Sequence, residues 1–240
     1  MTALRIFLQT LLITSYTVVL GPPAMLAALV GRSGSWALAV ARMWVRMILW
    51  TCGVRVVVEG VDQIDRHTPC IVMSNHQSFV DTAVLLHSFP GPLRFMAKRE
   101  LARIPIFGWS MAMGGHLLVD RGNRRAVKAT LDRGVSLVRS GKSLCVFPEG
   151  SRSPEGELAS FKNGGFQMAL EAQVPIQPVR IFGSGVLAPP DTAGIAPGEV
   201  VVRYLPRVLT EGCDAKDRPA LKNQVRESIL AAERPRRRTS

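Results

Sequence analysis

The chain has 240 residues, 47% of them hydrophobic, which is enough for one domain with a sizeable core. Its formal net charge of +12 indicates an anionic partner: nucleic acid, an anionic membrane surface or a phosphorylated substrate. Aromatic residues make up only 6% of the chain, and no zinc-finger, RNA-recognition or basic-zipper pattern is present, so we expect no nucleic acid partner.

The N-terminal stretch is the first predicted element. No charged residue occurs from Ile6 to Gly31, and a bilayer-crossing helix needs about 20 apolar residues. Gly21-Pro22-Pro23 is expected to break this stretch, because each proline removes a helical donor and clashes with the preceding turn. A cleaved signal peptide is the alternative, but its apolar region would be shorter and an A-x-A-like site would follow it.

A second apolar helix is predicted from Trp36 to Trp50. Arg42 and Arg46 share one of its faces, so we expect it to lie at the lipid headgroups, with arginine contacting phosphate and tryptophan in the interface. Residues 1–52 are therefore interpreted as a membrane-associating helical pair. Its first helix either spans the bilayer or enters and returns on one side.

The location follows from that break and from the cysteines. A break in the middle of the apolar stretch favours a first helix that enters the bilayer and returns on the same side. This arrangement keeps the rest of the chain on the cytoplasmic face of the inner membrane. No C-x-x-C pair is present, which indicates free thiols in a reducing compartment. The cysteines are Cys52, Cys70, Cys145 and Cys213.

Strands and helices alternate after residue 53. Strands are predicted at residues 54–59, 70–74, 93–97, 116–120, 144–147, 176–182 and 199–204. Helices are predicted at residues 79–86, 123–140, 166–171 and 214–232, with a broken helix at 99–113. This order predicts one α/β domain over residues 53–232, with helices on the faces of its sheet. Residues 233–240 form a basic tail that is expected to contact anionic lipid.

Polar residues follow several predicted strands, at the carboxyl ends where α/β folds build their sites. One such stretch, from Ser74 to Asp81, has two interpretations. Ser78 and Asp81 have the form of a capping box, which needs no catalysis. Alternatively, Asp81 reaches the imidazole of His76, fixes its tautomer and leaves the other nitrogen free as a base. No G-x-S-x-G elbow is present, so such a base would act on a hydroxyl that the substrate supplies.

Taken together, the motifs resemble those of the glycerolipid acyltransferases, in particular the bacterial 1-acylglycerol-3-phosphate acyltransferases. Asn75-His76 with Asp81 matches N-H-x4-D, and residues 147–153 match F-P-E-G-[ST]-R-S. Residues 115–121 and 174–179 match two further blocks, and the whole match covers residues 54–206. The departures from the family pattern are Leu118, Ser151 and Gln177, the last of which replaces an apolar residue.

The resemblance implies a mixed, largely parallel sheet and an enzyme without a metal or other cofactor. A fatty acyl group would pass from acyl-CoA or acyl carrier protein to the sn-2 hydroxyl of 1-acyl-sn-glycerol-3-phosphate, giving phosphatidic acid. His76 would be the general base, Asp81 would orient it, and backbone N–H groups at the start of the next helix would bind the oxyanion. The expected substrate-binding residues are Asn75, Lys98, Arg121, Glu149, Gly150 and Arg152. Lys98, Arg121 and Arg152 would bind the acceptor phosphate. Glu149 and Gly150 would shape the glycerol pocket.

Three other functions stay open at this point. A related acyltransferase would use another lysolipid, such as a lyso-ornithine lipid or a lysophosphocholine lipid. A thioesterase-like hydrolase would replace the acceptor hydroxyl with water. A non-catalytic membrane protein would keep the fold and bind anionic lipid, but it would not need the paired His76 and Asp81.

Overall fold

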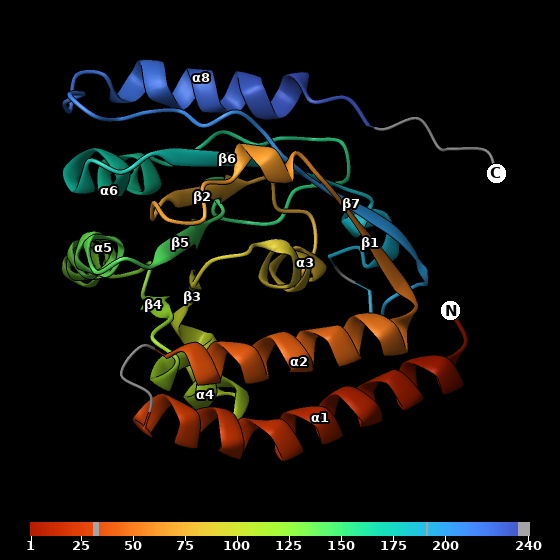
Figure 1. Ribbon diagram of the computed structural model, residues 1–240. Helices are drawn as coiled ribbons and strands as arrows, with labels where there is room; N and C mark the ends of the chain where they lie inside the picture. Colours follow the sequence, from red (N-terminus) through yellow and green to blue (C-terminus); the bar gives the residue numbers. More distant parts are fainter. Residues whose placement is uncertain (31–33, 191, 235–240) are drawn as a thin grey trace.

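The computed structural model describes residues 1–30, 34–190 and 192–234 (Figure 1). One sheet has the strand order β1-β7-β6-β2-β5-β3-β4. Strands β7 and β6 pair antiparallel, and the other neighbours pair parallel, which confirms the mixed, largely parallel sheet. The strands are β1 (Val54–Glu59), β2 (Ile71–Ser74), β3 (Leu93–Lys98), β4 (Leu117–Val119), β5 (Ser143–Val146), β6 (Ile176–Phe182) and β7 (Gly198–Tyr204).

The predicted helices are present, together with two short elements that the sequence did not indicate, η1 (Val61–Gln63) and α7 (Ser184–Leu187). The predicted break near Pro105 separates η2 (Arg99–Arg103) from α4 (Phe107–Met113). The other helices are α1 (Ala3–Val30), α2 (Ser35–Cys52), α3 (Val80–Ser88), α5 (Arg124–Arg139), α6 (Gly164–Ala172) and α8 (Arg218–Ala231). Residues 235–240 of the predicted basic tail lie outside the described residues.

Each face of the sheet carries an apolar cluster. On one face, Val45 and Leu49 of α2 and Val84 of α3 pack against the strands. On the other face, Val138 of α5 and Phe166 of α6 pack together with residues of α8. Figure 1 shows α1 as an outer layer, with α2 between it and the sheet. Helix α2 is therefore part of the hydrophobic core as well as part of the N-terminal pair.

The expected break at Gly21-Pro22-Pro23 is wrong, because α1 runs through both prolines as one helix. The fixed φ of proline fits a helix, but each proline still loses a donor and clashes with the preceding turn, so the helix needs other support here. Tertiary packing supports the helix at this point. A Cβ on Gly21 would lie 2.0 Å from Cγ2 of Ile106, so α4 approaches the α1 backbone closely, and the Ser110 hydroxyl donates to the Gly21 carbonyl at 3.4 Å.

Helix α1 exposes a long row of large apolar side chains. Its length and hydropathy are sufficient for a membrane span. Exposed apolar patches of this extent mark interaction with a membrane or another partner, so this helix can associate with a membrane. The exposed apolar residues of α1 are Leu4, Phe7, Leu8, Leu11, Leu12, Val18, Val19, Leu26, Leu29 and Val30, and Trp36, Trp50 and Trp109 are exposed on α2 and α4.

The expected headgroup role of Arg42 is not what the structure shows. Its guanidinium donates to the carbonyls of Leu86 at 3.3 Å, Phe89 at 2.6 Å and Gly91 at 2.8 Å. These carbonyls lie at the C-terminal end of α3, where a cation is favourable. Arg42 therefore joins α2 to α3, whereas Arg46 is exposed as expected. All four cysteines are free, as predicted.

Candidate active site

The stretch from Ser74 to Asp81 joins β2 to α3 at the carboxyl edge of the sheet, and β2 lies between β6 and β5. Asn75 is completely buried there. Its Nδ2 donates to the Ile181 carbonyl at 2.9 Å, and the Ile181 N–H donates to its Oδ1 at 2.8 Å. Asn75 was expected to bind substrate, but in this structure its amide fastens the chain to β6 where it leaves β2.

His76 and Asp81 form the expected pair, with Nδ1 2.9 Å from Oδ2. The Asp81 side chain is fully buried, and the imidazole keeps 19% of its side-chain surface exposed. The ring stacks on Phe147 with centroids 3.9 Å apart. The carboxylate and the aromatic ring therefore hold the imidazole, and Nε2 is its remaining nitrogen for proton transfer.

Both interpretations of Ser78 and Asp81 are partly right. Oδ2 of Asp81 accepts from the N–H groups of Gln77 at 2.7 Å and Ser78 at 2.9 Å, as the acidic residue of a capping box does. The Ser78 hydroxyl accepts from the Val80 N–H at 3.2 Å, so both hydrogen bonds of the box are made by Ser78 and Asp81, although Phe79 directly precedes the first residue of α3. One carboxylate oxygen thus serves the start of α3 and the imidazole together.

This arrangement corrects the expected source of oxyanion donors. The N–H groups of Gln77 and Ser78 are bound to Asp81, and that of His76 is bound to Glu149. A donor already held by a buried carboxylate is not free for a developing oxyanion. These three groups at the start of α3 therefore do not form an oxyanion hole in this structure.

Glu149 ties the loop after β5 to the histidine. It is only 3% exposed, and its Oε1 accepts from the His76 N–H at 2.7 Å. Its Oε2 accepts from the Ser153 hydroxyl at 2.5 Å and the Ala159 N–H at 2.8 Å. The Ser153 N–H donates to the His76 carbonyl at 2.8 Å. Both backbone polar groups of His76 are thus held by this loop. Glu149 was expected to shape the glycerol pocket, and in this structure its carboxylate holds the backbone of His76.

Gly150 allows two cations to approach the same turn. Its φ is +77°, and a Cβ would lie 2.7 Å from Cε of Lys162. Its carbonyl accepts from Nη1 of Arg121, which follows β4. Arg121 is therefore brought to the loop that holds His76. Sequence reasoning missed Lys162, because no motif marks it and only the return of the loop places it there, with its N–H donating to the Pro148 carbonyl at 2.7 Å.

Arg152 and Lys98 lie farther along the same edge. Arg152 is exposed and donates to the Pro190 carbonyl at 3.2 Å. Lys98 is exposed at the end of β3, where it pairs with Val119 of β4, and its amine makes no hydrogen bond or ion pair with any residue that the structure describes. Among the described residues, no hydrogen bond or ion pair joins either side chain to His76 or Asp81. With Arg121 and Lys162 they give this edge a positive margin suited to a phosphate group.

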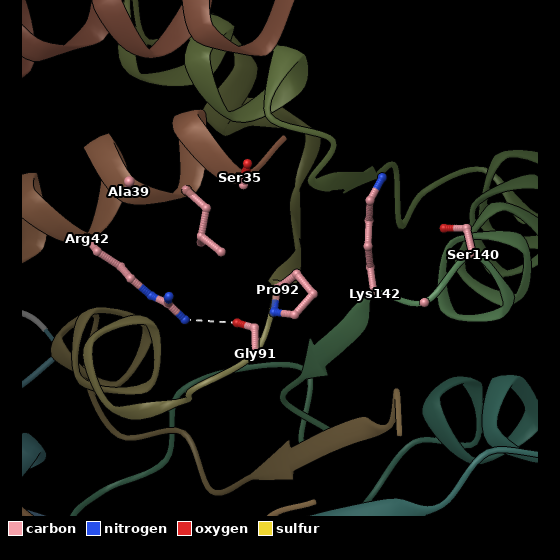
Figure 2. Close-up of a pocket in the computed structure, with 9 residues that line it drawn as sticks. Ser35, Ala39, Arg42, Gly91, Pro92, Ser140 and Lys142 are labelled. Atoms are coloured by element: carbon pink, nitrogen blue, oxygen red, sulfur yellow. Dashed lines mark hydrogen bonds between the residues drawn. The ribbon is translucent and has the colours of Figure 1, made fainter. Parts of the chain in front are cut away.

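A cavity of about 630 Å³ lies away from this edge, between α2 and the amino ends of β3 and β5. Figure 2 shows Arg42 and Lys142 among its lining residues, with Arg42 directed to the Gly91 carbonyl. Because Arg42 is bound to carbonyls, the cavity offers the Lys142 amine and no acid–base pair. Within residues 1–30, 34–190 and 192–234, no group of His, Cys, Asp and Glu side chains suits a metal. The paired imidazole and carboxylate of His76 and Asp81 lie at the carboxyl edge instead.

The relatives of this chain are acyltransferases. Residues 55–182 match the family model described as Acyltransferase. The 1-acyl-sn-glycerol-3-phosphate acyltransferase of Saccharomyces cerevisiae is 31% identical over 86% of this chain and 69% of its own length. The human alpha form is 33% identical over 80% of this chain and 68% of its own length. The chloroplastic form BAT2 of Brassica napus is 34% identical over 65% of this chain, which spans only 45% of the length of that relative.

A solved structure agrees with these matches. The crystal structure of the 1-acyl-sn-glycerophosphate acyltransferase PlsC from Thermotoga maritima superposes with a TM-score of 0.81 at 27% identity. The likeness covers 95% of this chain and 92% of that chain. The sheet and the N-terminal helices are thus shared as a whole. The chain belongs to the glycerolipid acyltransferase family.

Proposed function

We propose that this chain transfers a fatty acyl group from an acyl thioester to the sn-2 hydroxyl of 1-acyl-sn-glycerol-3-phosphate, giving phosphatidic acid. The observation that carries the proposal is the pairing of His76 with a buried Asp81 at 2.9 Å, on an edge with a positive margin. The names of the yeast and human relatives state an activity on the same acceptor.

In the proposed reaction, Nε2 of His76 accepts the proton of the acceptor hydroxyl while the oxygen attacks the thioester carbonyl carbon. Asp81 keeps Nδ1 protonated and stabilises the imidazolium. When the tetrahedral intermediate collapses, the C–S bond breaks and the departing thiolate takes the proton from Nε2. The products are phosphatidic acid and a free thiol, and no water is consumed. General-base assistance of this kind is worth about 10²–10⁴ in rate.

The acceptor phosphate is assigned to the cations at the edge. Arg152 and Arg121 suit bidentate contact with phosphate oxygens, and Lys98 has no competing partner among the described residues. Lys162 joins these candidates because it lies over Gly150. The donor is acyl-CoA or acyl carrier protein, and we propose that no metal or resident cofactor takes part in the step.

We further propose that the protein sits on one face of the membrane, the cytoplasmic face of the inner membrane. Polar contacts along α1 support this arrangement. The Tyr16 hydroxyl lies 3.0 Å from the Thr51 hydroxyl, and Nε1 of Trp44 donates to the Thr17 hydroxyl at 3.1 Å. A first helix that crossed the bilayer by itself would separate the Tyr16 hydroxyl and the Trp44 N–H from these partners, which is costly in lipid.

The test is an assay of the purified full-length chain with 1-acyl-sn-glycerol-3-phosphate and each thioester donor. Phosphatidic acid and free thiol should appear in equal amounts, and thiol release should stop when the acceptor is omitted. Thiol release without acceptor would instead indicate a hydrolase. Acylation of a lyso-ornithine lipid in preference to the phosphate acceptor would move the function to that lipid. No product with any donor or acceptor would overturn the proposal.

A further inference from the structure

Gln9 is an exception to the apolar exterior of α1. Its side chain is 4% exposed, whereas Phe7, Leu8 and Leu11 beside it are exposed. Its Nε2 donates to the Ile195 carbonyl at 2.8 Å, and the Ile195 N–H donates to its Oε1 at 3.0 Å. The amide therefore pairs with a single backbone residue in the way that two strand residues pair. A buried amide without such partners would be destabilising, so the two segments are specified for each other.

The segment that receives Gln9 is shaped for close approach. Gly194 has φ +81°, and a Cβ there would lie 3.1 Å from Oε1 of Gln9. Only glycine accommodates both this backbone conformation and this proximity without strain. The Ala196 N–H donates to the Leu187 carbonyl at 2.8 Å, which fastens the segment to α7. Residues 194–196 thus connect α1 to the end of α7.

The residues that directly follow α7 border the catalytic edge. The Pro190 carbonyl accepts from Arg152, a candidate for the acceptor phosphate. The start of α7 is held by Glu155, whose carboxylate accepts from the N–H groups of Gly183 at 2.8 Å and Gly185 at 2.9 Å. Both Arg152 and Glu155 belong to the loop that holds the catalytic histidine. A continuous set of hydrogen bonds thus links α1 to that loop.

We infer that Gln9 is a positioning residue that fixes the height of the catalytic edge above the membrane. The inference rests on the proposed function, because it concerns how a lipid acceptor reaches His76. The exposed apolar side chains set the depth of α1 in the bilayer. Apolar contacts are non-directional, and the Tyr16–Thr51, Thr17–Trp44 and Gly21–Ser110 hydrogen bonds join α1 to α2 and α4. The Gln9–Ile195 pair is a directional contact to a different part of the domain, and it sets the register of α1 against the segment beside α7. Acyl transfer to an acceptor held in a bilayer depends on this register, whereas transfer to an acceptor dispersed in detergent does not.

The test compares Gln9→Met with Thr10→Met. Both replace a polar side chain on α1 by methionine, but among the described residues the Thr10 hydroxyl bonds only to the Ile6 carbonyl of its own helix. Gln9→Met should lower kcat/KM about tenfold on acceptor in anionic vesicles, the equivalent of one or two net hydrogen bonds. It should leave kcat/KM on detergent-dispersed acceptor unchanged. Thr10→Met should leave both values unchanged, and both variants should bind vesicles as the parent does.

Amide hydrogen exchange on the vesicle-bound protein tests the contact directly. The Ile195 amide should exchange faster in Gln9→Met than in the parent or in Thr10→Met. Gly194→Ala should give the same vesicle-specific loss, and the double variant should lose little more. An equal loss of kcat/KM on vesicle-bound and on dispersed acceptor would show that Gln9 is merely structural. Unchanged kcat/KM on vesicles, or an unchanged exchange rate of the Ile195 amide, would also overturn the inference. Absence of activity in the parent on dispersed acceptor would instead count against the proposed function.

Discussion

Oε1 of Glu149 accepts a hydrogen bond from the backbone N–H of His76 at 2.7 Å. The two residues are 73 positions apart and belong to the two most specific motifs of the chain. Because the bond goes to the backbone of the histidine, it sets where the imidazole stands without competing for its ring nitrogens. The need to hold His76 is therefore a physical reason for the two motifs to occur together.

Glu149→Gln should lower kcat about tenfold or more while both KM values stay within about twofold, because a charge-assisted bond costs about 1.5–3 kcal/mol to lose. An amide has one acceptor oxygen and cannot serve His76 on one side and Ser153 with Ala159 on the other. Steady-state kinetics with each substrate varied checks this. A rise in the acceptor KM alone would support the glycerol contact expected from the sequence.

His76→Ala should abolish acyl transfer, with a loss of about 10²–10⁴ for removal of the general base. Its thermal unfolding should stay near that of the parent, because the imidazole is part-exposed at a loop. Asp81→Asn should lose most activity through the wrong tautomer and some stability through the weakened start of α3. Turnover of His76→Ala close to that of the parent would contradict the mechanism.

Arg152→Ala should raise the acceptor KM about ten- to a hundredfold and leave the donor KM nearly unchanged, as loss of a charge-assisted phosphate contact predicts. Lys98→Ala should act in the same direction. Arg133→Ala is the matched control, because it removes an exposed cation from α5. Initial rates with each substrate varied give the two constants. Equal rises in both would indicate disturbed folding rather than phosphate binding.

Washing membranes with high salt should not release the protein, because buried apolar area rather than charge holds α1 in the bilayer. A cysteine introduced near Met1, as Thr2→Cys in a background with Cys213→Ser, should react with a thiol reagent only after the inner membrane is permeabilised. The other three cysteines are buried and should stay unlabelled. Labelling from the periplasmic side would show that the first helix spans the membrane.

Stability should fall below neutral pH because of His116. Burial, with a contribution from Arg94, lowers the pKa of His116 to about 3, and its Nδ1 accepts from the Phe95 N–H at 3.1 Å. The unfolded pKa is about 6.5, so this stability is complete above pH 6.5 and is lost as pH falls toward 3. The loss should reach about 2 kcal/mol at pH 5.

Unfolding in detergent at pH 7.5 and pH 5 measures this dependence on His116. His116→Asn keeps an acceptor for the Phe95 N–H and cannot titrate, so its stability should change less between the two pH values. An equal loss of unfolding free energy between pH 7.5 and pH 5 in parent and variant would show that other groups control the acid sensitivity.

The sequence by itself determined the order of the elements and the pairing of the dyad. Strand β1 has its predicted bounds, and Asn123 caps α5 as expected, accepting from the N–H groups of Arg125 and Ala126. His76 and Asp81 meet because a strand-to-helix turn brings residues five apart together. These features depend on neighbouring residues, so a local pattern is sufficient to predict them.

Only the tertiary structure decided which polar side chains hold the site and which stay exposed at its edge. Asn75 bonds to Ile181, and Gln177 is buried and donates to the Leu205 carbonyl at 2.6 Å, so each has a structural partner that its motif did not indicate. The continuity of α1 through two prolines and the pairing of Gln9 with Ile195 were likewise invisible. Each depends on a partner distant in the chain, and which distant segments meet is set by strand order and packing, which no local pattern records.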